Sequence, residues 1–310
     1  MREWRGKLFR HSSGRPRLMG VINVTPDSFF PDSRTVIIGS KNLQTNSGGS
    51  KLPPNYLQPN TVIGRAKMFI DGGADWLDVG GESTRPGASP VAIEEELIRV
   101  VPAITAIREA YPDVAISVDT RHIEVAAAAL DAGADMVNDV SGLSDPRMRD
   151  LVIERGCMVC IMHMRGVPQG MQDDIEYDDV ISEVTNALLK TADDLVDRGH
   201  PVEAICLDPG IGFGKGLADN LALLSDECSR LLRAEKGYSL LWGVSRKSMF
   251  GDLLQRVETA ERLAGTLAVA AHAQSLGIDV LRVHDMIEHY DVGRTLAAFG
   301  SGNEGGDLNE

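Results

Sequence analysis

Aromatic residues and long hydrophobic runs are scarce in this sequence. Only 5% of the 310 residues are aromatic, although 43% are hydrophobic, with Ala, Val, Ile, Leu and Gly predominating. This composition is typical of parallel β-strands buried beneath helices. No apolar run reaches the roughly 18 residues that a membrane span requires, and the charged residues 1–17 do not resemble a signal peptide. We therefore expect no membrane partner and a cytoplasmic location.

Positive charge is also in deficit, since the formal net charge is −14 at pH 7. An acidic protein has no general attraction for nucleic acid, so we expect no nucleic-acid partner. An anionic substrate would need a local positive pocket. The overall acidity by itself indicates little more than solubility.

Cysteine is limited to four residues, Cys157, Cys160, Cys206 and Cys228. Cys157 and Cys160 have the C-x-x-C spacing of some redox and zinc sites. They lie on an expected strand, however, where residues three apart point to opposite faces, and no second C-x-x-C completes a zinc site. We expect neither function, and four thiols agree with a reducing cytoplasm.

Short hydrophobic runs alternate with helix-like stretches along the chain. Strands are expected at residues 18–24, 76–80, 115–119, 136–140, 158–162, 204–207, 240–244 and 280–283. Helices are expected at residues 90–110, 123–132, 175–198 and 259–275, and Asp145 before Pro146 is expected to cap another. Eight βα units with hydrophobic strands predict a closed parallel (β/α)8 TIM barrel of the α/β class. A doubly wound open sheet is the alternative architecture.

The barrel is expected to form a single domain over residues 17–299, preceded by an N-terminal extension over residues 1–16. Residues 35–58 are rich in Gly, Ser, Asn and Pro, which favours a flexible insertion after the first strand. The polar residues 300–310 are expected to be a disordered tail.

Polar residues follow nearly every expected strand. In TIM barrels the active site lies at the C-terminal ends of the strands, and a full ring of polar ends is hard to explain by helix capping alone. These ends carry Asn23, Thr84, Arg85, Asp119, Asn138, His163, Asp208, Ser245, Lys247, Arg282 and His284. The sequence therefore predicts an active site at the mouth of the barrel, the end where the C-termini of the strands meet.

One part of the predicted mouth suits a flat heterocycle. Asp119, Asn138, Asp208 and Lys247 offer acceptors, an amide and a cation near the barrel axis. A buried carboxylate needs a donor partner to stay charged. A heterocycle edge with several N–H groups in a row would supply that partner.

The other part suits an anion. Arg85, Arg282 and His284 form the local positive pocket that a diphosphate would need, and Asn23 adds an oxygen. Mg²⁺ is expected alongside, because it binds oxygens and phosphates and keeps most of its waters.

Several neighbouring side chains have simpler structural interpretations. Asp139 and Asp285 are equally well explained as structural partners or helix caps, and His163 as a core histidine. Arg246 is expected to form a structural ion pair rather than to contact substrate, and His122 is interpreted as structural.

At these residues the sequence resembles the dihydropteroate synthase family. The matching segments are residues 19–29, 78–87, 117–120, 138–142, 162–166, 207–215, 245–248 and 282–285. Together they cover roughly residues 17–299, and all eight in this order form a highly specific pattern.

The resemblance implies a transferase of folate biosynthesis that joins 6-hydroxymethyl-7,8-dihydropterin diphosphate to p-aminobenzoate. It implies a homodimer, a sulfonamide target, and catalytic roles for Asp119, Asp208, Lys247, Arg282 and His284. The implied pterin pocket comprises Asp119, Asn138, Met162, Asp208 and Lys247. The implied p-aminobenzoate site comprises Phe29, Thr84, Arg85, Pro86, Phe213 and Ser245. The implied diphosphate site comprises Asn23, Arg85, Arg282 and His284, with Asn23 linked to Mg²⁺.

The charge pattern supports the hypothesis of a dissociative reaction. The C–O bond to diphosphate would break first, Arg282 and His284 would take up negative charge, and Asp119 and Asp208 would stabilise the pterin cation. The ring of residues contains no nucleophile–base pair of the triad kind.

The first loop departs from the family. After Phe29 the chain continues with Phe30 and Pro31, where relatives more often have Ser-Asp-Gly-Gly. There are two alternatives. One is a pterin-binding methyltransferase that uses methyltetrahydrofolate and shares the pterin-side Asp and Asn. The other is a pterin-binding barrel without turnover, which the altered first loop leaves open. The diphosphate ligands and Thr84, Arg85 and Pro86 argue against the methyltransferase.

Overall fold

The computed structural model describes residues 9, 14–24, 62–83, 90–166 and 176–301. Eight parallel strands close into a barrel in the order in which they occur in the sequence. The strands are β1 (Arg17–Asn23), β2 (Trp76–Gly80), β3 (Ala115–Asp119), β4 (Met136–Asp139), β5 (Met158–Met162), β6 (Ile205–Asp208), β7 (Ser239–Trp242) and β8 (Val280–Val283). The predicted TIM barrel is confirmed, and the open doubly wound sheet is excluded.

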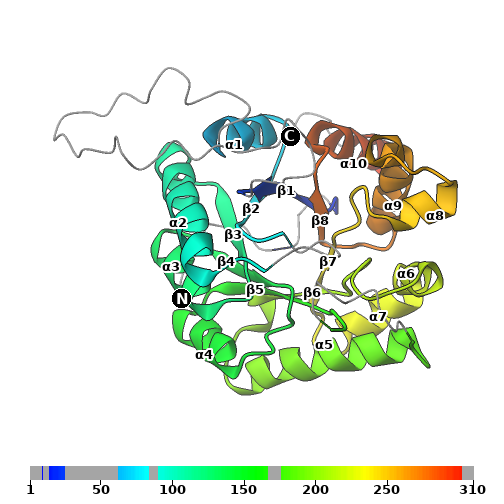
Figure 1. Cartoon of the computed structure of the whole chain (residues 1–310). Helices are drawn as coiled ribbons and strands as arrows, with labels where there is room; N and C mark the ends of the chain where they lie inside the picture. The colour runs from blue at the N-terminus through cyan, green and yellow to red at the C-terminus, as the bar shows by residue number, and fades with distance from the viewer. Residues whose placement is uncertain (1–8, 10–13, 25–61, 84–89, 167–175, 302–310) are drawn as a thin grey trace.

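Helices surround this barrel on the outside (Figure 1). They are α1 (Val62–Asp71), α2 (Ile93–Ala110), α3 (Ile123–Asp131), α4 (Pro146–Arg155), α5 (Val180–Asp197), α6 (Leu217–Leu223), α7 (Asp226–Arg233), α8 (Met249–Leu254), α9 (Leu263–Ser275) and α10 (Met286–Ser301). Among the described residues, 3-10 helices occur at Val202–Ala204 and Thr259–Arg262. In the described part of the chain, no helix is long and apolar enough to cross a membrane.

Side chains alternate between two hydrophobic cores. Outward-facing residues such as Leu77 and Val118 pack beneath the helices. Inward-facing residues such as Trp76, Met136 and Leu241 fill the barrel interior. Because side chains alternate along a strand, Trp76 at the start of β2 places Asp78 and then Gly80 toward the interior as well. The interior is thus apolar below and polar toward the mouth.

Phe9 lies at the apolar end of this interior. Its side chain is 1% exposed and stacks on Trp76 with ring centroids 5.9 Å apart. Phe9 belongs to the segment that the sequence predicts to be an extension outside the barrel, so at this residue the extension contributes to the core.

The C-X-X-C segment behaves as its strand position predicts. Cys157 packs in the outer core and Cys160 in the barrel interior. All four cysteines are buried thiols, so the structure gives no support for a redox or zinc role.

Helix ends follow local side-chain chemistry. The Asp145 carboxylate accepts a hydrogen bond from the Arg147 N–H at 2.9 Å, Pro146 occupies the first turn, and Gly156 ends α4 with φ of 56°. This arrangement is the usual one for a capped helix. The predicted cap at Asp145 is confirmed.

Several predicted boundaries are wrong by a few residues. Helix α2 starts at Ile93 rather than at Pro90, because the Val91 N–H is donated to the Glu82 carboxylate at 3.1 Å and Ala92 is extended. The expected helix over residues 259–275 begins with a 3-10 turn. Helix α10 continues to Ser301, past the boundary expected at residue 299.

Replacing Phe9 with Ala should lower the free energy of unfolding by about 3 kcal/mol, because it removes a buried aromatic side chain and leaves a cavity. Denaturant unfolding measures this change, and the turnover rate of the folded protein should stay the same. The control is Val257→Ala, since Val257 is 82% exposed and this variant should unfold like the wild type. Equal stability of Phe9→Ala and wild type would contradict the packing described for Phe9.

Candidate active site

The polar strand ends meet in one row at the mouth of the barrel. Asn23 of β1 is in register with Gly80 of β2, Gly80 with Asp119 of β3, and Asp119 with Asn138 of β4. Asp119 and Asn138 are 7% and 5% exposed. Adjacent strands therefore bring these predicted site residues together.

Arg282 of β8 crosses the interior to reach this row. Its Nε donates to Asp78 Oδ2 at 2.6 Å, and its Nη2 donates to Asp119 Oδ2 at 2.7 Å. Asn138 Nδ2 also donates to Asp78 Oδ2, at 3.3 Å. The predicted heterocycle side and the predicted anion side are thus joined by one chain of hydrogen bonds.

Asp119 has one carboxylate oxygen that can accept further hydrogen bonds. Burial raises the pKa of its carboxyl to about 7, and Arg282 opposes that rise. Among the described residues, Asp119 Oδ1 is buried and has no hydrogen-bond partner. A buried acceptor in this state is stabilised by a ligand that donates an N–H.

Asp208 and Lys247 lie at the ends of two other strands. Asp208 Oδ1 accepts a hydrogen bond from the Gly210 N–H at 2.7 Å, and burial raises the pKa of this carboxyl while Lys247 opposes the rise. Lys247 Nζ donates to the Ile211 carbonyl and lies 4.1 Å from the centre of the Phe213 ring. Burial lowers the pKa of Lys247 to about 7. Phe213 is therefore placed beside the Lys247 amine.

Lys215 fixes the loop that follows β6. It is 3% exposed, and its Nζ donates to the carbonyls of His163, Gly210 and Phe213 at 3.1, 3.0 and 2.9 Å. Its Nζ also lies 3.1 Å from His163 Nδ1. Burial lowers the pKa of His163 to about 4, so the neutral ring accepts this bond. His163 is thus a structural partner of Lys215.

Gly210 in the same loop has no room for a side chain. Its φ is 68°, and a Cβ would lie 1.9 Å from the carbonyl oxygen of His163. Only glycine fits this left-handed position without a backbone shift. The close approach of the His163 carbonyl oxygen therefore explains the glycine at this position.

His284 follows β8 and is held by Ser245. Ser245 Oγ lies 3.0 Å from His284 Nδ1 and accepts the His284 N–H at 3.2 Å. Burial lowers the pKa of His284 to about 3, and Arg282 lowers it further. The imidazole is therefore neutral in the substrate-free protein, and the positive charge expected here comes from Arg282.

Two neighbouring acidic residues have structural partners, as their simpler interpretations predict. Arg246 forms two hydrogen bonds to Asp285, at 2.8 and 2.7 Å. Asp139 accepts the N–H groups of Ser141 and Leu143 at 2.7 and 3.2 Å. The structural ion pair predicted for Arg246 is confirmed.

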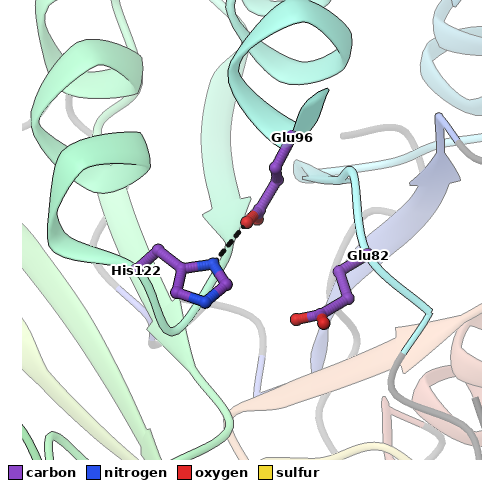
Figure 2. Close-up of side chains that lie close together, drawn as sticks. All are labelled: Glu82, Glu96 and His122. Atoms are coloured by element: carbon purple, nitrogen blue, oxygen red, sulfur yellow. Dashed lines mark hydrogen bonds and ion pairs between the residues drawn. The ribbon is translucent and has the colours of Figure 1, made fainter. Parts of the chain in front are cut away.

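A cluster beside the mouth contains Glu82, Glu96 and His122 (Figure 2). His122 Nδ1 donates to Glu96 Oε2 at 2.7 Å, and Glu96 is fully buried. Glu82 accepts two hydrogen bonds from Arg121, each at 3.0 Å, besides the one from Val91. Glu82 thereby links the end of β2 to Val91, just before α2. Because Arg121 already neutralises Glu82 and His122 pairs with Glu96, these contacts explain the cluster as structural.

The paired glycines before Glu82 serve this packing. A Cβ at Gly81 would lie 2.8 Å from Val100 and 2.9 Å from Glu96, and one at Gly80 would lie 3.3 Å from the Asp119 Cβ. Helix α2 and Asp119 can approach β2 closely only because both positions lack a side chain.

Not every predicted site residue can be located. Phe29, Thr84, Arg85 and Pro86 lie outside the described residues, as does most of the insertion-bearing first loop. Met162 ends β5 beside Asp208 and is 4% exposed. Asp78 and Lys215 are two further buried charged residues of the site that were not singled out from the sequence. Both lie within matched segments, and a charged residue at a position that must be buried was the available signal.

The comparisons with known proteins agree with this geometry. The profile of the family described as Pterin binding enzyme matches residues 45–284. The chain is 40% identical to the dihydropteroate synthase of Escherichia coli K12 across 96% of this chain and 98% of that protein.

The chain belongs to the dihydropteroate synthases.

Other dihydropteroate synthases match across nearly the whole structure. The enzyme from Yersinia pestis, solved with a sulfonamide drug, has a TM-score of 0.78 and 35% identity, covering 94% of this chain and 96% of that one. The enzyme from Burkholderia cenocepacia, solved with 7,8-dihydropteroate, has a TM-score of 0.76 and 36% identity, covering 94% of each chain. A probable bifunctional folylpolyglutamate synthase/dihydropteroate synthase from Haloferax volcanii is 41% identical over 88% of this chain, which spans 29% of that longer protein.

Replacing His122 with Ala should lower the free energy of unfolding by about 3 kcal/mol, because it leaves the buried Glu96 carboxylate without this hydrogen bond. Chemical denaturation measures the loss. In the Glu96→Gln background, where the buried charge is absent, the same substitution should cost about 1 kcal/mol. Equal costs in both backgrounds would show that His122 does not compensate a buried charge.

Proposed function

We propose that this chain joins 6-hydroxymethyl-7,8-dihydropterin diphosphate to p-aminobenzoate, releasing diphosphate and 7,8-dihydropteroate. The observation that carries the proposal is the chain of hydrogen bonds from Asn138 through Asp78 and Arg282 to Asp119. It puts acceptors for a heterocycle and a cation for its leaving group at one mouth.

The pterin is assigned to the carboxylate side of this mouth. Asp119 Oδ1 lacks a partner among the described residues, and the amino and ring N–H groups of a pterin would supply donors to it and to Asp208. Asn138 and Met162 would complete the pocket, with Lys247 beside it. The dihydropteroate bound to the Burkholderia cenocepacia enzyme supports this ligand class.

The diphosphate is assigned to Arg282 and His284. Arg282 is 22% exposed in its side chain and carries the charge, while a neutral His284 donates a hydrogen bond. Bond breaking leaves negative charge on the departing oxygen, and fixed donors aimed at that oxygen stabilise it without reorganisation. Arg85 would add a second cation.

p-Aminobenzoate is assigned to Phe213, Ser245 and the segment with Thr84, Arg85 and Pro86, together with Phe29. The Xanthomonas albilineans enzyme was solved with 4-aminobenzoic acid, which supports this second ligand. In the reaction, the pterin C–O bond breaks with its electron pair going to diphosphate, and the amine nitrogen forms the new C–N bond and loses one proton. Asp119 and Asp208 stabilise the pterin cation between these two events.

Mg²⁺ is the metal that the family implies, and Asn23 is the described residue that would bind it. The donor chemistry fits, since a neutral amide oxygen beside an anion site is enough for an ion that takes its other ligands from water and phosphate. When bound, Mg²⁺ would neutralise charge on the leaving diphosphate. Asn23 would then orient the diphosphate toward Arg282.

Two features of the surface and core bear on assembly and location. Helix α10 exposes Ile287 and Phe299, which are 58% and 77% exposed, and such apolar residues favour a contact between copies in the proposed homodimer. The buried thiols agree with the proposed cytoplasmic location.

Diphosphate release from the pterin diphosphate should require p-aminobenzoate, and kcat/KM should fall as the pH drops below about 7. The reason is that Asp119, whose pKa is raised to about 7, loses its negative charge there. Asp119→Asn should lower kcat/KM by about 100-fold. It should also abolish the fall of kcat/KM below about pH 7, which is the acidic limb of the pH profile. The control Asp145→Asn alters the cap of α4, and both its kcat/KM and its acidic limb should match those of the wild type. Persistence of the limb in Asp119→Asn would assign it to the substrate instead.

Chelation of Mg²⁺ with EDTA should abolish diphosphate release and be reversed by added Mg²⁺. Asn23→Ala should raise the Mg²⁺ concentration needed for half-maximal rate about tenfold. Calorimetry with a pterin that lacks the diphosphate provides the control, because its affinity should not change with EDTA. A wild-type Mg²⁺ requirement in Asn23→Ala would remove Asn23 from the proposed metal site.

A further inference from the structure

Asp78 is a buried carboxylate that none of the substrate assignments above uses. It lies in the middle of β2 and is 0% exposed. One of its oxygens, Oδ2, accepts hydrogen bonds from both Arg282 and Asn138. The other oxygen, Oδ1, has no hydrogen-bond partner among the described residues. Asp78 thus contacts one residue from each side of the mouth.

The way in which Asp78 holds Arg282 leaves part of the guanidinium available. Asp78 takes Nε, the nitrogen closest to the barrel wall, and Asp119 takes Nη2. In the described part of the chain, Nη1 has no partner. With Nε fixed, the terminal nitrogens can exchange Asp119 for an anion while the guanidinium stays in place.

We propose that Asp78 is a positioning residue that holds Arg282 at Nε and Asn138 at Nδ2. With Nε held, the terminal nitrogens of Arg282 can bind diphosphate in place of Asp119 while the guanidinium keeps its position. This inference rests on the proposed function, because it names the residue that sets the geometry of that same site. Without Asp78, Asp119 is the remaining described partner of Arg282, and no described residue would hold Nε when the terminal nitrogens bind an anion.

Stability alone does not account for a carboxylate here. Two negative charges, Asp78 and Asp119, share one guanidinium in a buried space, and buried ion pairs contribute little net stability. Asp78 also adds to the rise in the pKa of Asp119. The charge of Asp78 therefore has a consequence at the mouth that a neutral isostere would not reproduce.

Asp78→Asn keeps the shape of the side chain and removes its charge. We expect kcat/KM for the pterin diphosphate to fall about 10- to 100-fold, as for other residues that orient a substrate-binding group. The KM for p-aminobenzoate should change less than about threefold, because Asp78 contacts none of its assigned site. The acidic limb should move to lower pH, since removing a neighbouring negative charge lowers the pKa of Asp119.

The matched control is Asp75→Asn, one residue before the same strand. Asp75 is also a buried aspartate paired with arginine, at 2.9 Å from Arg15 and 3.1 Å from Arg17, but it precedes β2 at the end opposite the mouth. It should lower the melting temperature and leave kcat/KM and the acidic limb unchanged. This separates loss of a buried ion pair from loss of positioning.

A second variant separates position from charge and remains informative if Asp78→Asn fails to fold. Asp78→Glu keeps the charge but displaces the carboxylate by one methylene, so kcat/KM should fall while the acidic limb stays in place. In an Arg282→Gln background, Asp78→Asn should cost less than about threefold further, because the two residues act as one unit.

Wild-type turnover tests the proposed function first, independently of Asp78. If the wild type is active, full activity of Asp78→Asn would overturn the positioning role. Losses that multiply with those of Arg282→Gln, or that affect both substrates equally without a shift in the acidic limb, would overturn it as well. The positioning role is supported if kcat/KM falls for the pterin diphosphate alone, if this loss is not additive with that of Arg282→Gln, and if the acidic limb moves to lower pH.

Discussion

The site depends on a single guanidinium placed between two carboxylates inside the barrel. Arg282 pairs with both Asp78 and Asp119, and a carboxylate without such a partner would not stay charged in the interior. The three residues come from β8, β2 and β3, so closure of the barrel is what brings them together. The fold and the electrostatics of the mouth are therefore one constraint, because an open sheet would separate β8 from β2.

Space around this ion network is created by residues without side chains. Gly80 leaves room for Asp119, and Gly81 lets Glu96 and Val100 of α2 pack against the turn after β2. Glu96 then holds His122, while Arg121 holds Glu82. The Asp78–Arg282–Asp119 network and the Glu82–Glu96–His122 cluster thus each have their own partners. The structural interpretation of Glu82, Glu96 and His122 follows from these partners, which carboxylate clustering alone would not reveal.

Much of the fold was predictable from the sequence, because buried parallel strands have a strong local signature. Hydrophobic runs such as residues 76–80 and 115–119 match the observed strands residue for residue. Helix starts were less predictable, since the position of Ile93 depends on Val91 bonding to Glu82, a contact made through tertiary structure. The ring of polar strand ends predicted the neighbourhood of Asp119, Asn138 and Arg282. Asp78 was not singled out, because its partner Arg282 is 204 residues away in sequence.

The apolar end of the barrel interior determines from which side ligands can reach the site. Phe9 and Trp76 close the end of the interior opposite Asp119, so the ion network has a dry, sealed base beneath it. A sealed base leaves the C-terminal rim as the route by which both reactants arrive and both products depart.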